Sequence, residues 1–484
     1  MTHLPRTRPS AAGVDPAALL ALVDALDASP HEPHSLMVLR HGSVVAEGWW
    51  APYRPELPHL LYSLSKAFTA TAAGLAIEEG LFGLDDRLVD LLPGHGPTPP
   101  HERVAAMTVR HALTMTTGHA TDPIFTLFPW ILEHPGGDWL DGFFELVPED
   151  EPGRPFTYNQ LATYSVARAV EARTGGRLLD YLAPRLFAPL GIDDASWLST
   201  GGHDLGFAGL HLRTESIAAF GQLCLQAGRW GDRRLVPADW MRAATSLQVS
   251  NRPEDRGAGD QNAEPDWNAG YGYQFWMCRH GYRGDGALGQ FCIVWPDEDV
   301  VIATTAAAPD MQALLDLIDE HLGGALDRPG ADEAATAAAE ADLTARCAGL
   351  SLPTPVHHGD HRSVAGRFAR TEDGAAPSVA AVTVTPTDDG WTLCLDHRGG
   401  PAELPVGLGR WTDGTWPAGR GRVALPTAAA GGITDDGRLR VEIVLTQTPH
   451  RLILDLHPAT GAVSLAWNQF PLHGADPGDL AVTA

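Results

Sequence analysis

The N-terminal half of the chain alternates short strand patterns with longer helical ones. Residues 35–49 predict a strand, a His-Gly turn and a second strand, because apolar residues alternate beyond the turn. The stretch that starts at Lys66 predicts a helix, since Phe68 and later apolar residues recur on one face and Gly80 ends the pattern. An earlier helix is expected to begin with Asp15 as its N-cap and a proline at its first position.

A second group of strand patterns follows a helical region that extends to about residue 195. Residues 270–280, 289–296 and 299–306 are rich in aromatic and β-branched residues and predict strands. The amphipathic stretch 311–326 predicts a helix that packs on such a sheet. Strands and helices in this order favour an α/β (α+β) fold.

The pattern changes again beyond residue 325. Residues 326–350 are predicted to be a linker that holds a short Ala-rich helix. From residue 351 to 484, short alternating strands separated by Asp-Asp-Gly turns predict a small antiparallel β domain, either a lipocalin-like barrel or a sandwich. A chain of 484 residues also exceeds the size at which one core usually keeps growing. We therefore predict two domains, residues 1–325 and residues 351–484.

The composition excludes several classes of partner. The formal net charge is −26 and the sequence pI is about 5.1, so the surface should repel the phosphates of nucleic acids and anionic membranes. The opening residues lack the apolar core of a signal peptide, and no later run of apolar residues is long enough to span a bilayer. A cytoplasmic protein is the default expectation.

The five cysteines and the histidine clusters do not follow a metal or disulfide pattern. The cysteines are widely spaced and include no C-x-x-C, so buried thiols are expected, with an approach of Cys278 to Cys292 left open. Histidines cluster at 31–34 and 357–361, but neither cluster has a recognised ligand spacing. No metal and no cofactor are expected.

The most informative position is Lys66, the single lysine among 34 basic residues. Ser63 precedes it by three residues, so on a helix the lysine amine can reach the serine hydroxyl. That hydroxyl becomes an effective nucleophile when a base removes its proton, and a buried lysine can be the base, whereas arginine stays protonated. The backbone N–H of Ser63, at the start of the helix, is also placed to bind an oxyanion. Ser65 is a weaker candidate nucleophile because its side chain points elsewhere.

Several stretches of the sequence carry a family resemblance. They are LMVLRHGSVVAEGWWAPY, LYSLSKAFTATAAGLAIEEGLFGLDD, RHALTMTTGH, FTYNQLATYSVARAVEARTGG, RTESIAAFGQLCLQAGRW, and GYGYQFW followed by GDGALGQFCIVWPDEDVVIA. With them the chain resembles the serine β-lactamase and penicillin-binding protein superfamily over residues 10–325, and within it the class C-like esterases, D-aminopeptidases and aminohexanoate-oligomer hydrolases. The resemblance implies an antiparallel sheet flanked by helices, an all-α subdomain, and hydrolysis through an acyl-enzyme on Ser63.

The resemblance also assigns roles beyond the S-x-x-K motif. Tyr158 in FTYNQ corresponds to a tyrosine that exchanges protons with the nucleophile and the leaving group. Asn159 follows it directly, and Gln160 holds the place where the family usually has asparagine. Either amide is therefore a candidate contact to the substrate.

The family's third motif falls on residues 284–286. The residues that hold the carboxylate of a β-lactam are absent, and Asp285 stands in their place, where it could favour an amine-bearing substrate. Gly286 would let the substrate lie close to the strand, and the N–H of Ala287 would be the second oxyanion donor. This departure weakens the case for β-lactamase or carboxypeptidase activity, unless Arg279 or Arg283 folds back into the cleft.

Aromatic residues shortly before the nucleophile are candidates for an acyl pocket. They are Trp49, Trp50 and Tyr53, although burial in the core explains them equally well.

Three functions stay open at this point. The first is a serine hydrolase that acts on a small ester, amide or short peptide. The second is an acyltransferase or peptide cyclase that excludes water and passes the acyl group to an amine. The third is a non-catalytic binding or sensor protein, against which the placement of the only lysine counts. The C-terminal domain is expected to carry no catalytic residue and to pack near the entrance of the site, and a homodimer is left open.

Overall fold

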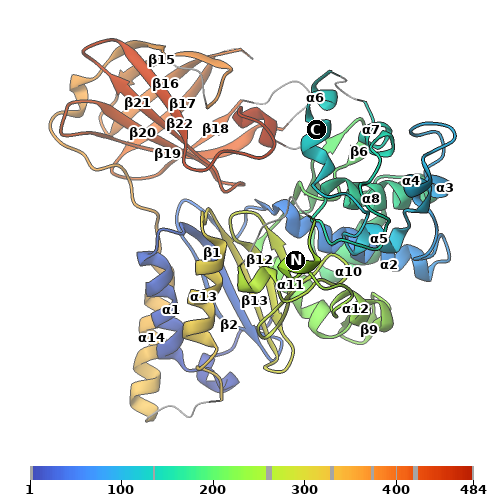
Figure 1. Ribbon diagram of the computed structural model, residues 1–484. Helices are drawn as coiled ribbons and strands as arrows, with labels where there is room; N and C mark the ends of the chain where they lie inside the picture. Colours follow the sequence, from blue (N-terminus) through green and yellow to red (C-terminus); the bar gives the residue numbers. More distant parts are fainter. Residues whose placement is uncertain are drawn as a thin grey trace.

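The protein is described here by a computed structural model covering residues 4–133, 137–257, 264–327, 332–371, 375–398, 401–417 and 423–481. Its N-terminal part is a sheet with helices around it, and its C-terminal part is a β-barrel (Figure 1). In Figure 1 the barrel, coloured orange and red, lies above the sheet and beside the helical region.

A six-stranded antiparallel sheet forms the centre of the N-terminal part. The strand order is β10-β11-β12-β13-β1-β2, and every neighbouring pair is antiparallel. All positions of β1, β12 and β13 are buried, as expected of strands covered on both faces. The strands are β1 (Pro33–Arg40), β2 (Ser43–Trp49), β10 (Trp276–Cys278), β11 (Gly281–Gly286), β12 (Gln290–Trp295) and β13 (Val300–Ala306).

The strands expected at 35–49, 289–296 and 299–306 are confirmed. The prediction of a strand over residues 270–280 is wrong for residues 270–275. Only Trp276–Cys278 join the sheet, as β10. Gln274 has a φ of +67°, in the left-handed region that an extended strand does not use.

Helices cover the sheet on both sides (Figure 1). On one side α11 (Thr214–Leu225) packs along β12, β13 and β1. On the other side α1 (Pro16–Ala28), α13 (Met311–Leu322) and α14 (Glu333–Ala348) lie together. The expected N-cap of α1 is confirmed, because the Asp15 side chain accepts a hydrogen bond from the backbone N–H of Ala17 at 3.0 Å.

The segment predicted to be a linker contains α14, a helix of 16 residues that packs against α1 and β2. The division of the chain at residues 325 and 351 stays a prediction.

A helical region extends from the edge of the sheet. Short strand pairs and 3-10 turns connect its helices. The helices are α2 (Ser65–Glu78), α3 (Leu88–Leu91), α4 (Glu102–Ala106), α5 (Val109–Leu113), α6 (Pro123–Glu133), α7 (Trp139–Glu145), α8 (Gln160–Thr174), α9 (Leu178–Leu182), α10 (Ala188–Leu190) and α12 (Ala238–Ala244). The short strands are β3 (His59–Leu60), β4 (Ser196–Trp197), β5 (Ser199–Thr200), β6 (His203–Asp204), β7 (Leu210–Leu212), β8 (Arg229–Trp230) and β9 (Arg233–Arg234).

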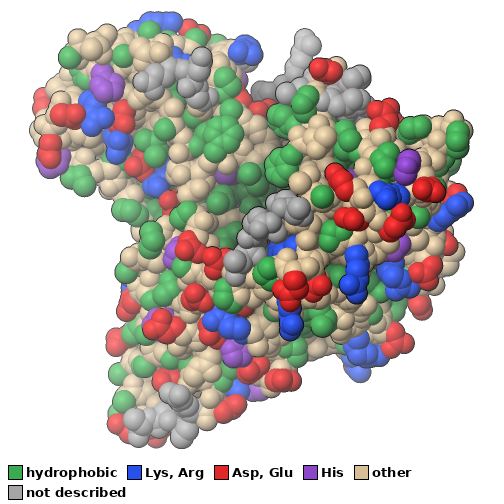
Figure 2. Space-filling view, viewed as in Figure 1, with side chains coloured by type: hydrophobic (Ala, Val, Ile, Leu, Met, Phe, Trp, Pro, Cys, Tyr) green, Lys and Arg blue, Asp and Glu red, His purple; other side chains and the backbone are tan. Residues whose placement is uncertain are grey.

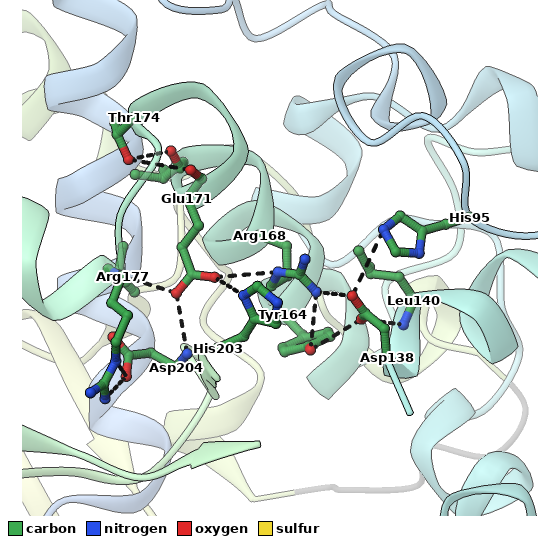
Figure 3. A network of polar contacts seen from close by, with 12 residues as sticks. His95, Asp138, Leu140, Tyr164, Arg168, Glu171, Thr174, Arg177, His203 and Asp204 are labelled. Atoms are coloured by element: carbon green, nitrogen blue, oxygen red, sulfur yellow. Dashed lines mark hydrogen bonds and ion pairs between the residues drawn. The ribbon is translucent and has the colours of Figure 1, made fainter. Parts of the chain in front are cut away.

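A buried polar network holds α8 in this region (Figure 3). Arg168 of α8 pairs with Asp138 at the start of α7, and its Nε lies 3.3 Å from Glu171 Oε2. The same Glu171 oxygen lies 2.7 Å from Nδ1 of His203 on β6. Since the Arg168 and Glu171 side chains are only 9% and 5% exposed, their charges need one another to be tolerated. The network thereby fixes the helix whose first residues face the candidate active site.

The C-terminal part is a closed barrel, which decides between the two architectures expected from the sequence. Its strand order is β17-β16-β15-β14-β22-β21-β20-β19-β18, and pairing of β17 with β19 closes it. The buried indoles of Trp391 and Trp416 help fill its core. The strands are β14 (Gly366–Arg370), β15 (Val379–Pro386), β16 (Gly390–His397), β17 (Ala402–Leu408), β18 (Thr412–Trp416), β19 (Leu425–Ile433), β20 (Leu439–Leu445), β21 (Arg451–His457) and β22 (Ala462–Trp467).

The surface is rich in acidic side chains, which are spread over the face seen in Figure 2, in keeping with the net charge of −26. Among the described residues, no helix combines the length and apolar character needed to cross a membrane.

Candidate active site

Ser63 lies in a tight turn at the entrance to a buried helix. The turn is the 3-10 helix η2 (Tyr62–Leu64), and α2 follows it directly. Lys66 belongs to the first turn of α2 and is 1% exposed, and its Nζ lies 2.9 Å from Ser63 Oγ. The spacing of three residues therefore brings the amine to the hydroxyl, through a 3-10 turn followed by a helix instead of one continuous helix.

Two further oxygens hold the lysine amine. Nζ of Lys66 donates to Oε1 of Gln160 at 2.6 Å and to the carbonyl oxygen of Phe207 at 2.9 Å. A neutral amine has two N–H groups and one lone pair. With both N–H groups directed at these oxygens, the lone pair faces Ser63 Oγ. The geometry suits a base that accepts the serine proton.

Burial makes such a base available near neutral pH. It lowers the pKa of Lys66 from 10.5 to about 7, because the charged ammonium is taken out of water. The carboxylates of Asp122 and Asp285 act in the opposite direction and raise this pKa. At pH 7 a large share of the molecules therefore holds Lys66 as the free amine.

Tyr158 stands over the same pair of residues. Its ring centroid is 4.8 Å from Lys66 Nζ, and it lines the pocket together with Ser63. The ring also packs against Trp276, with centroids 5.2 Å apart. Burial raises the pKa of the Tyr158 phenol, so the hydroxyl keeps its proton at neutral pH and can donate it.

The two neighbouring amides have different surroundings. Asn159 is fully buried and caps α8, since its Oδ1 accepts from the N–H of Ala162 at 3.0 Å and its Nδ2 donates to Thr117 Oγ1 at 3.0 Å. Gln160 lines the pocket around Ser63 and accepts from Lys66. Of the two candidates, the structure brings Gln160 to the site and uses Asn159 to start the helix.

Strand β11 lies directly against the turn that carries Ser63. A Cβ at Gly286 would lie 2.1 Å from the carbonyl oxygen of Leu61, and one at Gly284 would lie 2.4 Å from the side chain of Leu64. The missing side chains thus leave room for the nucleophile turn, whereas the sequence interpretation left this room for the substrate. Ala287, the residue after β11, lines the pocket together with Ser63.

Asp285 is paired with a buried cation. Its Oδ2 lies 2.9 Å from Nε of Arg283, which is fully buried and stacked over the ring of Trp267, with Cζ 4.4 Å from the ring centroid. Arg279 instead pairs with Asp266 and other carboxylates outside the pocket. Arg283 therefore balances part of the charge of Asp285, which itself lines the pocket, and a role of this carboxylate in binding an amine stays a prediction.

The pocket above Ser63 has a volume of about 980 Å³ and an aromatic and acidic wall. The other residues that line it include Tyr158, Trp267, Trp276 and Asp122. Its size is typical of a site for a small molecule or short peptide.

The aromatic residues before the nucleophile lie outside this pocket. Trp50 is buried elsewhere, and its indole N–H donates to Asp27 at 2.7 Å. The Tyr53 hydroxyl donates to the carbonyl oxygen of Thr448 in the barrel. Trp49 flanks a different surface hollow, between β2 and α14. The structure therefore does not bring these residues to the pocket, because their side chains contact Asp27, the barrel and the hollow beside α14 instead.

Ser65 also lies away from the pocket. It is fully buried, and its Oγ donates to the carbonyl oxygen of Tyr62 at 2.6 Å.

The sequence interpretation missed Asp122. Its Oδ1 accepts from the backbone N–H groups of Ile124 and Gln160, at 3.1 and 3.2 Å, and burial raises its pKa to about 6. An Asp-Pro pair at the start of a helix could have identified it as an N-cap. No local pattern could place it beside Lys66, because that contact joins two distant parts of the chain.

The chain matches known proteins over its N-terminal part. A family model described as Beta-lactamase matches residues 24–318. The 6-aminohexanoate-dimer hydrolase of Paenarthrobacter ureafaciens is 25% identical over 296 residues, which is 57% of this chain and 73% of that protein.

Two solved structures show a similar fold. EstCE1, a hydrolase with promiscuous acyltransferase activity, superposes with a TM-score of 0.52 at 17% identity, over 64% of this chain and 99% of its own. SurE superposes with a TM-score of 0.50 at 18% identity, over 86% of this chain and 94% of its own.

Proposed function

Because the chain belongs to the Beta-lactamase family, whose model spans residues 24–318, we propose that it is a serine hydrolase that cleaves an ester or amide through an acyl-enzyme on Ser63. The observation that carries the proposal is the 2.9 Å contact between Ser63 Oγ and the amine of Lys66, together with the fall of that amine's pKa to about 7. A nucleophile and a base poised near the working pH are what acyl transfer requires.

The first step forms the acyl-enzyme. Neutral Lys66 takes the proton of Ser63 Oγ as that oxygen attacks the carbonyl carbon of the substrate. The negative charge that develops on the carbonyl oxygen is bound by the backbone N–H groups of Ser63 and Ala287. When the bond to the leaving group breaks, Tyr158 gives its proton to the departing oxygen or nitrogen and receives the proton held by Lys66.

The second step releases the acid. Water loses a proton to neutral Lys66 and attacks the acyl carbon, and that proton returns to Ser63 Oγ as the ester bond breaks. The second step needs the same oxyanion site and the same base as the first. The neutral form of Lys66 is therefore required twice in each turnover.

Transfer of the acyl group to an amine or alcohol is a second candidate. It is supported by the likeness to EstCE1, whose acyltransferase activity is promiscuous, and by a pocket of about 980 Å³ that has room for an acceptor beside the acyl group. Adding an alcohol or amine acceptor to an ester assay would reveal it as a new ester or amide product.

Labelling and mutation of Ser63 test the proposal. The wild-type protein should hydrolyse a short-chain nitrophenyl ester and should be labelled by a fluorophosphonate, with the label on Ser63 in the peptide mass map. Ser63→Ala should remove both turnover and label without changing the thermal unfolding temperature much. A label on Ser65, or full turnover by Ser63→Ala, would refute the assignment of Ser63 as the nucleophile. If the wild type is inactive toward a broad panel of esters, D-amino-acid amides and linear amides, a non-catalytic binding protein would be favoured.

A further inference from the structure

The residue that precedes the nucleophile has an unusual backbone. Tyr62 has a φ of +47° and is 1% exposed. A bulky residue rarely occupies this left-handed region, and it stays there only where its surroundings hold it. The peptide bond between Tyr62 and Ser63 carries the N–H that we assign to the oxyanion site. Whatever holds Tyr62 therefore sets the direction of that N–H.

The side chain of Tyr62 is held by the C-terminal barrel. Its hydroxyl lies 2.5 Å from Nε2 of His450, and the backbone N–H of Leu472 points at the same hydroxyl from 3.4 Å. The imidazole of His473 stacks on the tyrosine ring, with centroids 5.3 Å apart and an interplanar angle of 24°. These three partners come from two barrel loops, the turn between β20 and β21 and the segment after β22.

The direction of the hydrogen bond follows from the other ring nitrogen of His450. Its Nδ1 lies 2.8 Å from the carbonyl oxygen of Gln469, and a carbonyl can only accept, so Nδ1 carries the proton. Nε2 is then a bare acceptor, and the Tyr62 hydroxyl donates to it. Burial lowers the pKa of His450 to about 3, so the imidazole stays neutral at any pH at which the protein would be assayed.

The same barrel turn also accepts hydrogen bonds from the segment that leads to Tyr62. The backbone N–H of Leu60 donates to the carbonyl oxygen of Gln447 at 2.8 Å, and the Tyr53 hydroxyl donates to that of Thr448 at 2.9 Å. Three contacts from residues 447–450 thus meet the segment that ends at Ser63.

We propose that His450 is a positioning residue for the nucleophile. By accepting the hydrogen bond of the Tyr62 hydroxyl, it holds Tyr62 in the left-handed backbone conformation that directs the Ser63 N–H and Oγ into the pocket. The barrel is in this sense part of the acylation machinery, although none of its described residues lines the pocket above Ser63. The inference rests on the proposed function, in which Ser63 is the nucleophile.

Matched variants of the full chain test the proposal. His450→Phe keeps a ring of similar size and removes the acceptor, Tyr62→Phe removes the donor, and His450→Gln keeps an acceptor near the position of Nε2. Asp413→Asn is the control, because it breaks an exposed contact between the two parts of the chain, the 2.7 Å ion pair with Arg54, without touching Tyr62.

We expect His450→Phe and Tyr62→Phe each to lower kcat for a nitrophenyl ester, and the rate of fluorophosphonate labelling of Ser63, by roughly 10- to 100-fold with little change in KM. The double variant should lose no more than either single variant, since both remove the same hydrogen bond. His450→Gln should recover much of the rate, and Asp413→Asn should match the wild type.

Each other outcome counts against the inference. If His450→Phe and Tyr62→Phe fold and react at the wild-type rate, the hydrogen bond does not position Ser63. If Asp413→Asn slows the reaction as much as they do, general loosening of the interface explains the loss. Fluorophosphonate labelling of the wild type comes first, before any variant is compared. A wild type that is not labelled at Ser63 would overturn the proposed function itself.

Discussion

Replacing Lys66 by methionine should inactivate the protein and remove the cost of a buried charge, and this electrostatic gain in stability should depend on pH. Methionine has a similar length and no charge, so it removes the amine without leaving a large void. The buried ammonium is unfavourable in the folded protein, where its pKa is about 7, compared with 10.5 for the ordinary side chain. The fall in pKa corresponds to about 5 kcal/mol of unfolding free energy at low pH, at about 1.36 kcal/mol for each pKa unit.

The pH window follows from the two pKa values. Below about pH 7 lysine is protonated in both states, and the folded protein carries the full cost. Between pH 7 and 10.5 the unfolded chain holds the proton and the folded protein has lost it, so the wild type gains about 1.4 kcal/mol of stability for each pH unit. Above 10.5 the amine is neutral in both states and the cost disappears.

A second effect of the substitution does not depend on pH. Methionine leaves Gln160 Oε1 and the Phe207 carbonyl without the donor that they have in the wild type, and each unsatisfied buried acceptor costs about 1–3 kcal/mol. The two acceptors together cost about 2–6 kcal/mol, which is comparable to the electrostatic gain at pH 6, so the sign of the net change is not the test. This cost is the same at every pH. The pH dependence of the stability difference between Lys66→Met and the wild type therefore reports on the ionisation of Lys66 alone.

The assay is urea unfolding followed by tryptophan fluorescence at pH 6, 8 and 10. The stability of Lys66→Met relative to the wild type should fall by about 4 kcal/mol from pH 6 to pH 10. Ser63→Ala is the control, since it keeps the lysine and should keep the pH dependence of the wild type. A difference between Lys66→Met and the wild type that is the same at all three pH values would refute the depressed pKa, and with it the argument that Lys66 is the base.

Further predictions concern the base, the buried network and the substrate. Lys66→Arg should lower kcat by the roughly 10²- to 10⁴-fold typical of losing a general base, because arginine stays protonated. Near-normal turnover of the arginine variant would mean that the site needs only a cation. Wild-type kcat should rise with pH through about 7, as Lys66 loses its proton. Arg168→Met should destabilise the protein by about 3–5 kcal/mol in urea unfolding, since it removes the guanidinium shared by the buried Glu171 and the partly buried Asp138. In contrast Arg87→Met, which breaks an exposed pair with Asp90, should change the unfolding free energy by less than about 1 kcal/mol, and equal effects of the two variants would contradict the role given to burial. Nitrocefin should be hydrolysed at least roughly 10- to 100-fold more slowly than a nitrophenyl ester, because a charged hydrogen bond to the β-lactam carboxylate, worth about 1.5–3 kcal/mol, is missing, and efficient hydrolysis would show that Arg283 reaches the ligand.

The local part of the candidate site could be predicted from the sequence. Ser63 and Lys66 are three residues apart, and a turn of 3-10 or α-helix brings such residues together whatever the rest of the chain does. The strand pairs, the capped helix after Asp15 and the change to a β domain are equally local, since they follow from periodicity and turn residues. The family resemblance predicted that Tyr158 and Ala287, which belong to separate motifs, lie near Ser63, and both line the pocket.

The remaining features depend on contacts between distant residues, which periodicity does not encode. Thr117 and Ala162 bind the Asn159 side chain, so that Gln160 is the amide that lies in the pocket beside Lys66, and which amide contacts the substrate stays a prediction. The sequence by itself determined the pairing of the proposed nucleophile Ser63 with the proposed base Lys66, because this pairing is a property of one helical turn. Only the tertiary structure decided how low the pKa of Lys66 falls and what holds Tyr62 before Ser63, because burial and the approach of His450 exist only once the whole chain has packed.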